Sequence, residues 1–73
     1  MKKLYEGQRN SLYYLQKRLN LDIKRLYRYA DGKIDVGKMP VEVLCGIANV
    51  EGIDPVVLYR AIKEYQEKKA LNK

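Results

Sequence analysis

Residues 19–33 read LNLDIKRLYRYADGK, a stretch in which one helix ends and another begins and ends. Asn20 is among the few non-glycine residue types that tolerate a left-handed backbone, so it predicts a helix end in a tight turn. Asp22 is a favoured N-cap residue, and Gly32 suits the C-terminal cap of the helix that follows. The stretch therefore predicts two short helices that meet at a sharp turn.

The residues before this stretch carry a single apolar stripe. Leu12, Leu15 and Leu19 recur at spacings of three and four, which is typical of a helix with one buried face. Ser11 stands just before the stripe and is the expected N-cap. Residues 2–8 predict a further short helix at the N-terminus.

A long apolar run follows the polar connection after Gly32. Pro40 fits the first turn of a helix, because its missing N–H is not needed there. The run from Val41 to Val50 is apolar nearly all round, which predicts a central, buried helix ending at Gly52. Cys45 has no second cysteine to pair with and is expected to be a small buried hydrophobe.

The C-terminal part predicts a last helix. Asp54-Pro55 repeats the pattern of a cap followed by proline, and the helix is expected to cover about residues 55–70, with a frayed tail at residues 71–73. The chain lacks the alternation of apolar and polar residues that marks a strand. The expected fold class is all-α: a compact bundle of four to five short helices in a single domain, residues 1–73.

Composition argues against several classes of protein. The chain has no His and no Thr, one Ser and one Cys, so nucleophilic catalysis and a tetrahedral zinc site are not expected, and neither is a cofactor. Its apolar runs are far shorter than the ~20 residues that span a bilayer, and no signal-type stretch follows Met1-Lys2-Lys3. We expect a cytoplasmic protein that is not an enzyme, with neither a membrane nor a small-molecule substrate as partner.

The positive charge is concentrated in the first half of the chain. Residues 1–38 contain ten Lys and Arg against four Asp and Glu, whereas residues 39–73 contain five of each, and the net charge is +6. Such an uneven distribution of charge favours a surface that binds a polyanion, and nucleic acid is the first polyanion to expect.

Two segments resemble a known family. SLYYLQKRLNLDIKRLYRYADGK, residues 11–33, looks like the helix-turn-helix unit of the phage-repressor (Cro/Xre, lambda-repressor-like) family. PVEVLCGIANVEGIDPVVL, residues 40–58, is similar to that family's fourth helix, although Glu51 stands where a core leucine is common. The resemblance implies a lambda-repressor-like fold and a small sequence-specific regulator of transcription that binds double-stranded DNA, of phage or mobile-element type.

The same resemblance implies roles for individual residues. The recognition helix is expected at about residues 22–30, lying in the major groove. The residues expected to contact bases are Ile23, Lys24, Tyr27 and Arg28. The residues expected to contact phosphates are Lys17, Arg18, Arg25, Lys33 and Lys38. Arg28 suits the paired acceptors of guanine, and Ile23 suits a thymine methyl.

Partners other than DNA stay open. Regulators of this kind usually bind as homodimers, with Leu58, Ile62 and Tyr65 of the last helix as the candidate contact, although a monomer is also compatible. An alternative function is a protein-interaction module, an inhibitor or adaptor, that binds through Leu12, Tyr13 and Tyr14. Seven tyrosines on a basic chain leave single-stranded nucleic acid as a third option.

Overall fold

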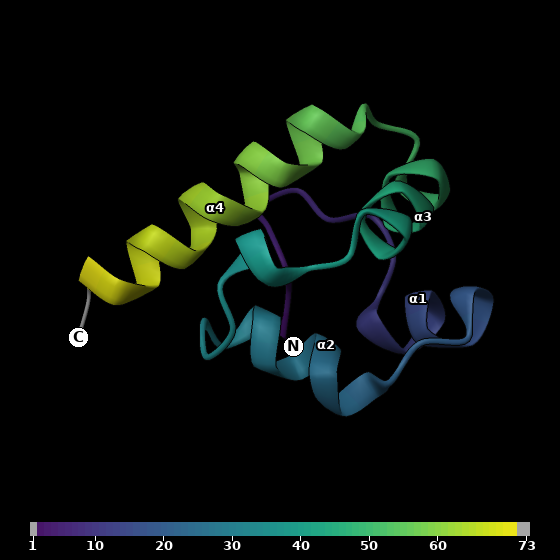
Figure 1. Ribbon diagram of the computed structural model, residues 1–73, viewed down its shortest axis with the longest axis horizontal. Coiled ribbons are helices and arrows are strands. Elements are labelled where there is room, and N and C mark those ends of the chain that lie inside the picture. Colours follow the sequence, from purple (N-terminus) through teal and green to yellow (C-terminus); the bar gives the residue numbers. More distant parts are fainter. Residues whose placement is uncertain (1, 72–73) are drawn as a thin grey trace.

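The computed structural model describes residues 2–71, in which the ordered elements are helices. They are α1 (Leu12–Leu19), α2 (Ile23–Ala30), the 3-10 helix η1 (Val36–Lys38), α3 (Val41–Glu51) and α4 (Pro55–Leu71). In Figure 1, α4 runs along the upper left, α2 lies at the bottom, and α1 and α3 lie at the right. Since residues 2–71 contain no strand, the predicted all-α class is confirmed for the described chain.

The ends of α3 and α4 follow the local signals in the sequence. Pro40 immediately precedes α3, and Gly52 terminates it with a left-handed φ of 74°. Asp54 then accepts a hydrogen bond from the N–H of Val56 at 2.8 Å, which satisfies one of the free donors at the start of α4. The predicted boundaries of these two helices are confirmed to within about a residue.

The predicted helix at residues 2–8 is absent. Residues 2–10, which we call the N-terminal strap, form bends and a turn instead. Gly7 adopts a φ of 86°, outside the helical region, and the N–H of Leu4 donates to the side chain of Gln8 at 2.7 Å. Leu4 is fully buried and Tyr5 nearly so, which means that the strap contributes to the core without helical structure.

Glu51, the last residue of α3, holds the strap in place. The residue is only 1% exposed, and its carboxylate accepts four hydrogen bonds from the strap. The donors are Tyr5 Oη, Arg9 N at 2.9 Å, Asn10 N at 3.0 Å and Asn10 Nδ2. Burial acts to raise the pKa of Glu51, but these donors together keep it below its ordinary value. Burial and the bond to Glu51 raise the pKa of Tyr5.

A second buried polar side chain joins α4 to the segment after α2. Gln66 accepts from Val36 N at 3.0 Å and donates to the carbonyl oxygens of Tyr29 and Ile34 at 2.9 Å each. Ile34 lies between regular elements, and Val36 N–H is at the start of η1, so a side chain supplies partners that the helices do not. Gln66 thereby fixes the connection between α2 and η1 against α4.

The prediction of a buried α3 is wrong on one side of the helix. Ile47 and Ala48 are buried, but Val41 is 72% exposed and Cys45 is also exposed. α3 packs against α1 and α4 with the opposite face, where Gly46 lets the side chain of Leu19 approach closely. An apolar run without polar contrast gives no information about which side faces the core.

The C-terminal helix extends slightly farther than expected. Leu71 is the last residue of α4, so the frayed tail does not begin there, and residues 72–73 lie outside the described chain. None of the helices in residues 2–71 has the length and apolar character needed to span a membrane.

Candidate nucleic-acid interface

A tight turn sets the angle between α1 and α2. Ser11 caps α1 by accepting from Tyr14 N at 3.1 Å, as its sequence position predicts. Asn20 ends α1 with φ 55° and ψ 50°, the predicted left-handed conformation. Asp22 then caps α2 by accepting from Lys24 N at 2.9 Å, two residues after the turn. All three predicted caps are confirmed, and they place α2 immediately after a sharp change of direction.

The two sides of α2 differ in chemistry. Leu26, Tyr29 and Ala30 are at most 2% exposed and fix one side against the core. Lys24 and Arg28 are exposed and four residues apart, so they lie one above the other on the opposite side. This arrangement presents two cations side by side on a helix whose other face is held rigidly.

The other two residues that were predicted to contact bases differ in their exposure to solvent. Tyr27 is 41% exposed and lies on the same surface. Ile23 is half-buried and packs against the core cluster, so only part of its side chain reaches solvent. The structure therefore groups Lys24, Tyr27 and Arg28, with Ile23 at the edge of the group.

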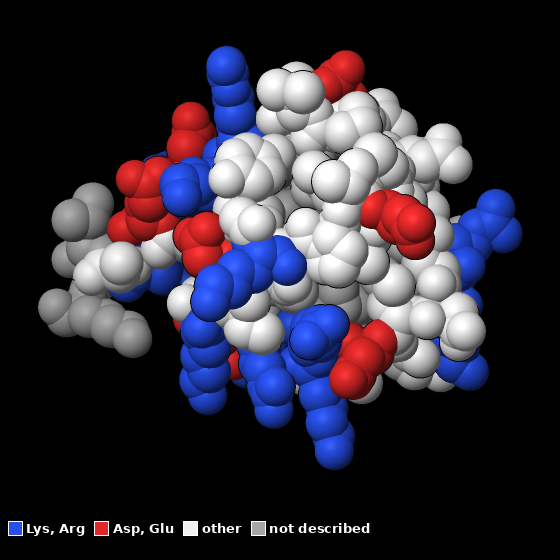
Figure 2. Space-filling model, in the orientation of Figure 1, with Lys and Arg blue, Asp and Glu red and all other residues white. Residues whose placement is uncertain are grey.

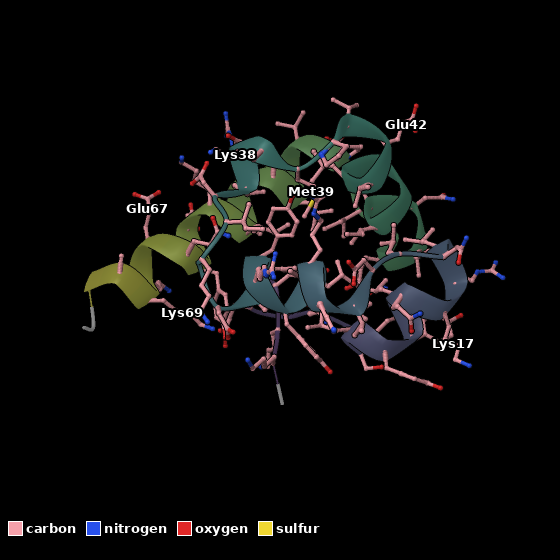
Figure 3. All side chains as sticks on the ribbon, turned by 60° about the horizontal axis from the view of Figure 1, so that its bottom comes forward. Lys17, Lys38, Met39, Glu42, Glu67 and Lys69 are labelled. Carbon is pink, nitrogen blue, oxygen red and sulfur yellow. The ribbon has the colours of Figure 1, made fainter. Side chains whose placement is uncertain are left out.

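The five predicted phosphate contacts come from α1, α2, the connection after α2 and η1. All five are exposed: Lys17, Arg18, Arg25, Lys33 and Lys38. Arg25, Lys33 and Lys38 line a shallow hollow of about 550 Å³ beside α2. Lys17, from α1, lies on the other side of α2 from Lys38, as Figure 3 shows. In Figure 2, Lys and Arg side chains project along the lower edge over α2 and at the right over α1.

Nearby acidic side chains are engaged by other groups. Asp22 is the N-cap of α2, and Asp35 accepts from Gly37 N at 2.8 Å while its other oxygen lies 3.5 Å from Lys63. Asp31 pairs with Lys2 at 2.7 Å, and this hydrogen bond holds the pKa of Asp31 below its ordinary value. The surface formed by the predicted base and phosphate contacts thus keeps its positive character, although three carboxylates lie near it.

The residues predicted to bind protein partners are only partly accessible. Leu12 is 3% exposed and belongs to the core, whereas Tyr13 and Tyr14 are 62% and 48% exposed. Leu58 and Ile62 of α4 are fully buried, which removes them as a dimer contact. Their apolar spacing marks the face that packs inside the domain, because a core stripe and an interface stripe have the same period.

The contact of Lys2 with α2 was not anticipated. Its Nζ lies 5.4 Å from the centre of the Tyr27 ring and pairs with Asp31, 29 residues away in the chain. No sequence signal links positions so far apart.

In the described part of the chain, no three Cys, Asp or Glu side chains gather in a way that would hold a metal ion.

No protein-family model, curated protein or solved structure gives a significant match to the chain.

Proposed function

We propose that this protein is a small regulator of transcription that binds double-stranded DNA sequence-specifically through α2. The observation that carries the proposal is the surface formed by Lys24, Tyr27 and Arg28 on a helix whose opposite side is buried. Because the core fixes the orientation of this helix, its exposed side chains are held in a constant relation to one another, as direct readout of bases requires.

The dimensions of α2 suit the proposed role. An α-helix with its side chains is about 10–12 Å across, and the major groove of B-DNA is roughly 12 Å wide. Arg28 would donate two hydrogen bonds to a guanine, and Lys24 and Tyr27 would reach neighbouring bases or phosphates. Cations on both sides of α2 would contact the two flanking backbones, which positions the helix without reading sequence.

The resemblance to phage-repressor-like helix-turn-helix proteins supports the same proposal. Two short helices joined at Asn20, with Lys24 and Arg28 exposed on the second, are compatible with an arrangement in which the second helix would enter the groove. The phage or mobile-element origin rests on this resemblance. A homodimer remains part of the proposal, but its contact would have to exclude the buried Leu58 and Ile62.

An NMR titration tests where the protein contacts DNA. Duplex DNA from the neighbourhood of the protein's gene is added to ¹⁵N-labelled protein, and amide shifts are followed residue by residue. We expect the largest changes in α2 and in the residues that line its flanks. Changes confined to α4, or no change at low salt, would contradict the proposal.

The exposed Tyr13 and Tyr14 support a second candidate, an inhibitor or adaptor that binds another protein through α1. The two tyrosines are adjacent and exposed, and tyrosine is enriched in protein interfaces. Replacing both with serine distinguishes the candidates. Duplex binding should fall only modestly if α2 is the reader, whereas a protein complex centred on α1 should be lost.

A further inference from the structure

Exposed apolar side chains lie on one face of the domain, formed by the start of α3 and one side of α4. Val56 is 62% exposed and Tyr59, three residues later, is half-buried, so both lie on the same side of α4. The hydroxyl of Tyr59 reaches η1, since a Cβ added to Gly37 would lie 3.6 Å from that oxygen. Pro40 and Val41, which follow η1, are exposed. We call Pro40, Val41, Val56 and Tyr59 the apolar face.

Two charged side chains of opposite sign border the apolar face. Lys38, the last residue of η1, and Glu42, in the first turn of α3, are both exposed. Figure 3 shows them at opposite ends of one side of the domain, both pointing away from it, with Met39 between them. A cation at one end and a carboxylate at the other make this border self-complementary. When a second copy is turned by a two-fold rotation, each Lys38 meets the Glu42 of the other copy.

The distribution of charge favours a second copy of this chain as the occupant of the apolar face. Residues 1–38 carry ten positive and four negative side chains, so two copies repel each other through the basic surface. Residues 39–73 carry five of each, and in Figure 2 the surface over α3 and the first turns of α4 is mostly uncharged. Nucleic acid would be drawn to the basic surface instead. Two copies therefore meet with the least repulsion at the apolar face.

The size of the domain allows a weak dimer. Transient interfaces bury less than about 1,200 Å² in total, or roughly 600 Å² per copy. This is roughly a tenth of the 5164 Å² of accessible surface on the chain, which measures 32 × 23 × 21 Å. The buried Leu58 and Ile62 take no part, because the apolar face uses the neighbouring side of α4.

We propose that the apolar face joins two copies of this chain into a weak homodimer, with Val41 and Val56 at the centre and reciprocal Lys38–Glu42 pairs at the border. The dimer rests on the proposed function for its purpose, which is to bring two copies of α2 to one duplex, but it forms without DNA. Lys38 also lines the hollow beside α2, so the dimer contact would lie close to the surface proposed to bind DNA.

Sedimentation equilibrium of the full chain without DNA tests the proposal. We expect the measured mass to rise from 8.6 kDa toward twice that value as the protein concentration rises from micromolar to millimolar. Val56→Glu should weaken the dimer about 10-fold or more, because it places an unpaired charge inside an apolar contact. A mass of 8.6 kDa at every concentration would overturn the proposal.

Val57→Glu is the matched control. Val57 is 56% exposed and undergoes the same change of charge, but it points about 100° away from Val56 around α4 and still farther from Tyr59. Both positions lie in the first turn of α4, where glutamate is favourable, so both variants should fold. Val57→Glu should leave the dimer within about 2-fold of wild type. Equal losses for the two variants would overturn the proposal.

Exchange of the border charges tests the symmetry of the contact. Lys38→Glu and Glu42→Lys should each weaken the dimer about 3- to 10-fold at low salt, since each places like charges together. The double variant should bind its own copy within about 2-fold of wild type. A double variant as weak as the single ones would overturn the proposed pairs.

The same measurements separate the dimer from the proposed function. If wild type binds no duplex, the proposed function fails, and the mass measured without DNA still decides whether the apolar face joins two copies. A chain that binds duplex but stays monomeric would overturn the dimer and leave the proposed function intact.

Discussion

The buried carboxylate of Glu51, at the end of α3, accepts a hydrogen bond from the phenolic hydroxyl of Tyr5, 46 positions earlier in the chain. The same carboxylate also accepts from the strap residues Arg9 and Asn10. One side chain thus attaches a segment without helix or strand to the rest of the domain. The strap in turn carries Lys2 to the exposed side of α2.

Replacing Glu51 with glutamine should destabilise the domain. The amide NH₂ would face N–H and O–H donors where a carboxylate oxygen now accepts, so at least one buried donor loses its partner. We expect Glu51→Gln to lower the free energy of unfolding by about 1–3 kcal/mol in urea denaturation. The matched control is Glu42→Gln, an exposed position on the same helix, which should change it by no more than about 0.5 kcal/mol. Equal effects at the two positions would contradict the role of Glu51.

Acid should weaken the same attachment. The folded-state pKa of Glu51 lies below its ordinary value of 4.5, so its contribution to stability is complete above that value and is lost as pH falls through the folded pKa. Asp31, whose pKa is also lowered by Lys2, acts in the same direction. We expect the free energy of unfolding to decline below about pH 4.5, and less steeply in Glu51→Gln. An identical pH dependence in the two proteins would exclude Glu51 as a source of the decline.

Alanine and glycine at position 20, in the turn between α1 and α2, should differ in their effect on stability. Asn20 has φ 55°, a conformation that is strained for a residue with Cβ and free of that strain for glycine. Asn20→Ala should lower the free energy of unfolding by about 1 kcal/mol, whereas Asn20→Gly should leave it within about 0.5 kcal/mol of wild type. Thermal or urea denaturation measures both. Equal tolerance of the two substitutions would mean that the turn relaxes away from this geometry.

Arg28 and Lys17 should differ in how they affect DNA binding. Arg28→Ala, on the reading side of α2, is expected to cost about 1–3 kcal/mol on the preferred sequence and to relax the preference at one base pair. Lys17→Ala, on α1, is expected to weaken all duplexes to a similar degree. Binding of both variants to a panel of single-base substitutions measures the difference. Matching profiles for the two variants would rule out α2 as the reader.

Local signals predicted most helix ends correctly. Ser11, Asn20, Asp22 and Gly52 act within a few residues of their own positions, through a cap hydrogen bond or a left-handed backbone. The buried side of α2 was also predictable, because Leu26 and Tyr29 are apolar residues spaced three apart on a helix that is otherwise largely polar.

The sequence patterns did not predict the long-range polar contacts. Glu51 and Gln66 are polar residues that hydropathy assigns to the surface, yet both are buried by partners 30 or more residues away. Their partners are side chains and backbone groups far away in the chain, and such contacts leave no periodic mark in a sequence. For the same reason the contact of Lys2 with α2 was missed. The exposure of Cys45 was missed because apolar residues lie on all sides of α3, so the sequence does not show which side faces solvent.

Duplex affinity measured against salt concentration tests the function of α2 most directly. DNA from the neighbourhood of the protein's gene is compared with random duplex of equal length. We predict specific binding roughly 10³-fold or more above random duplex, with the logarithm of affinity falling linearly with the logarithm of salt concentration. Equal affinity for every duplex, or no binding at low salt, would contradict sequence-specific recognition by α2.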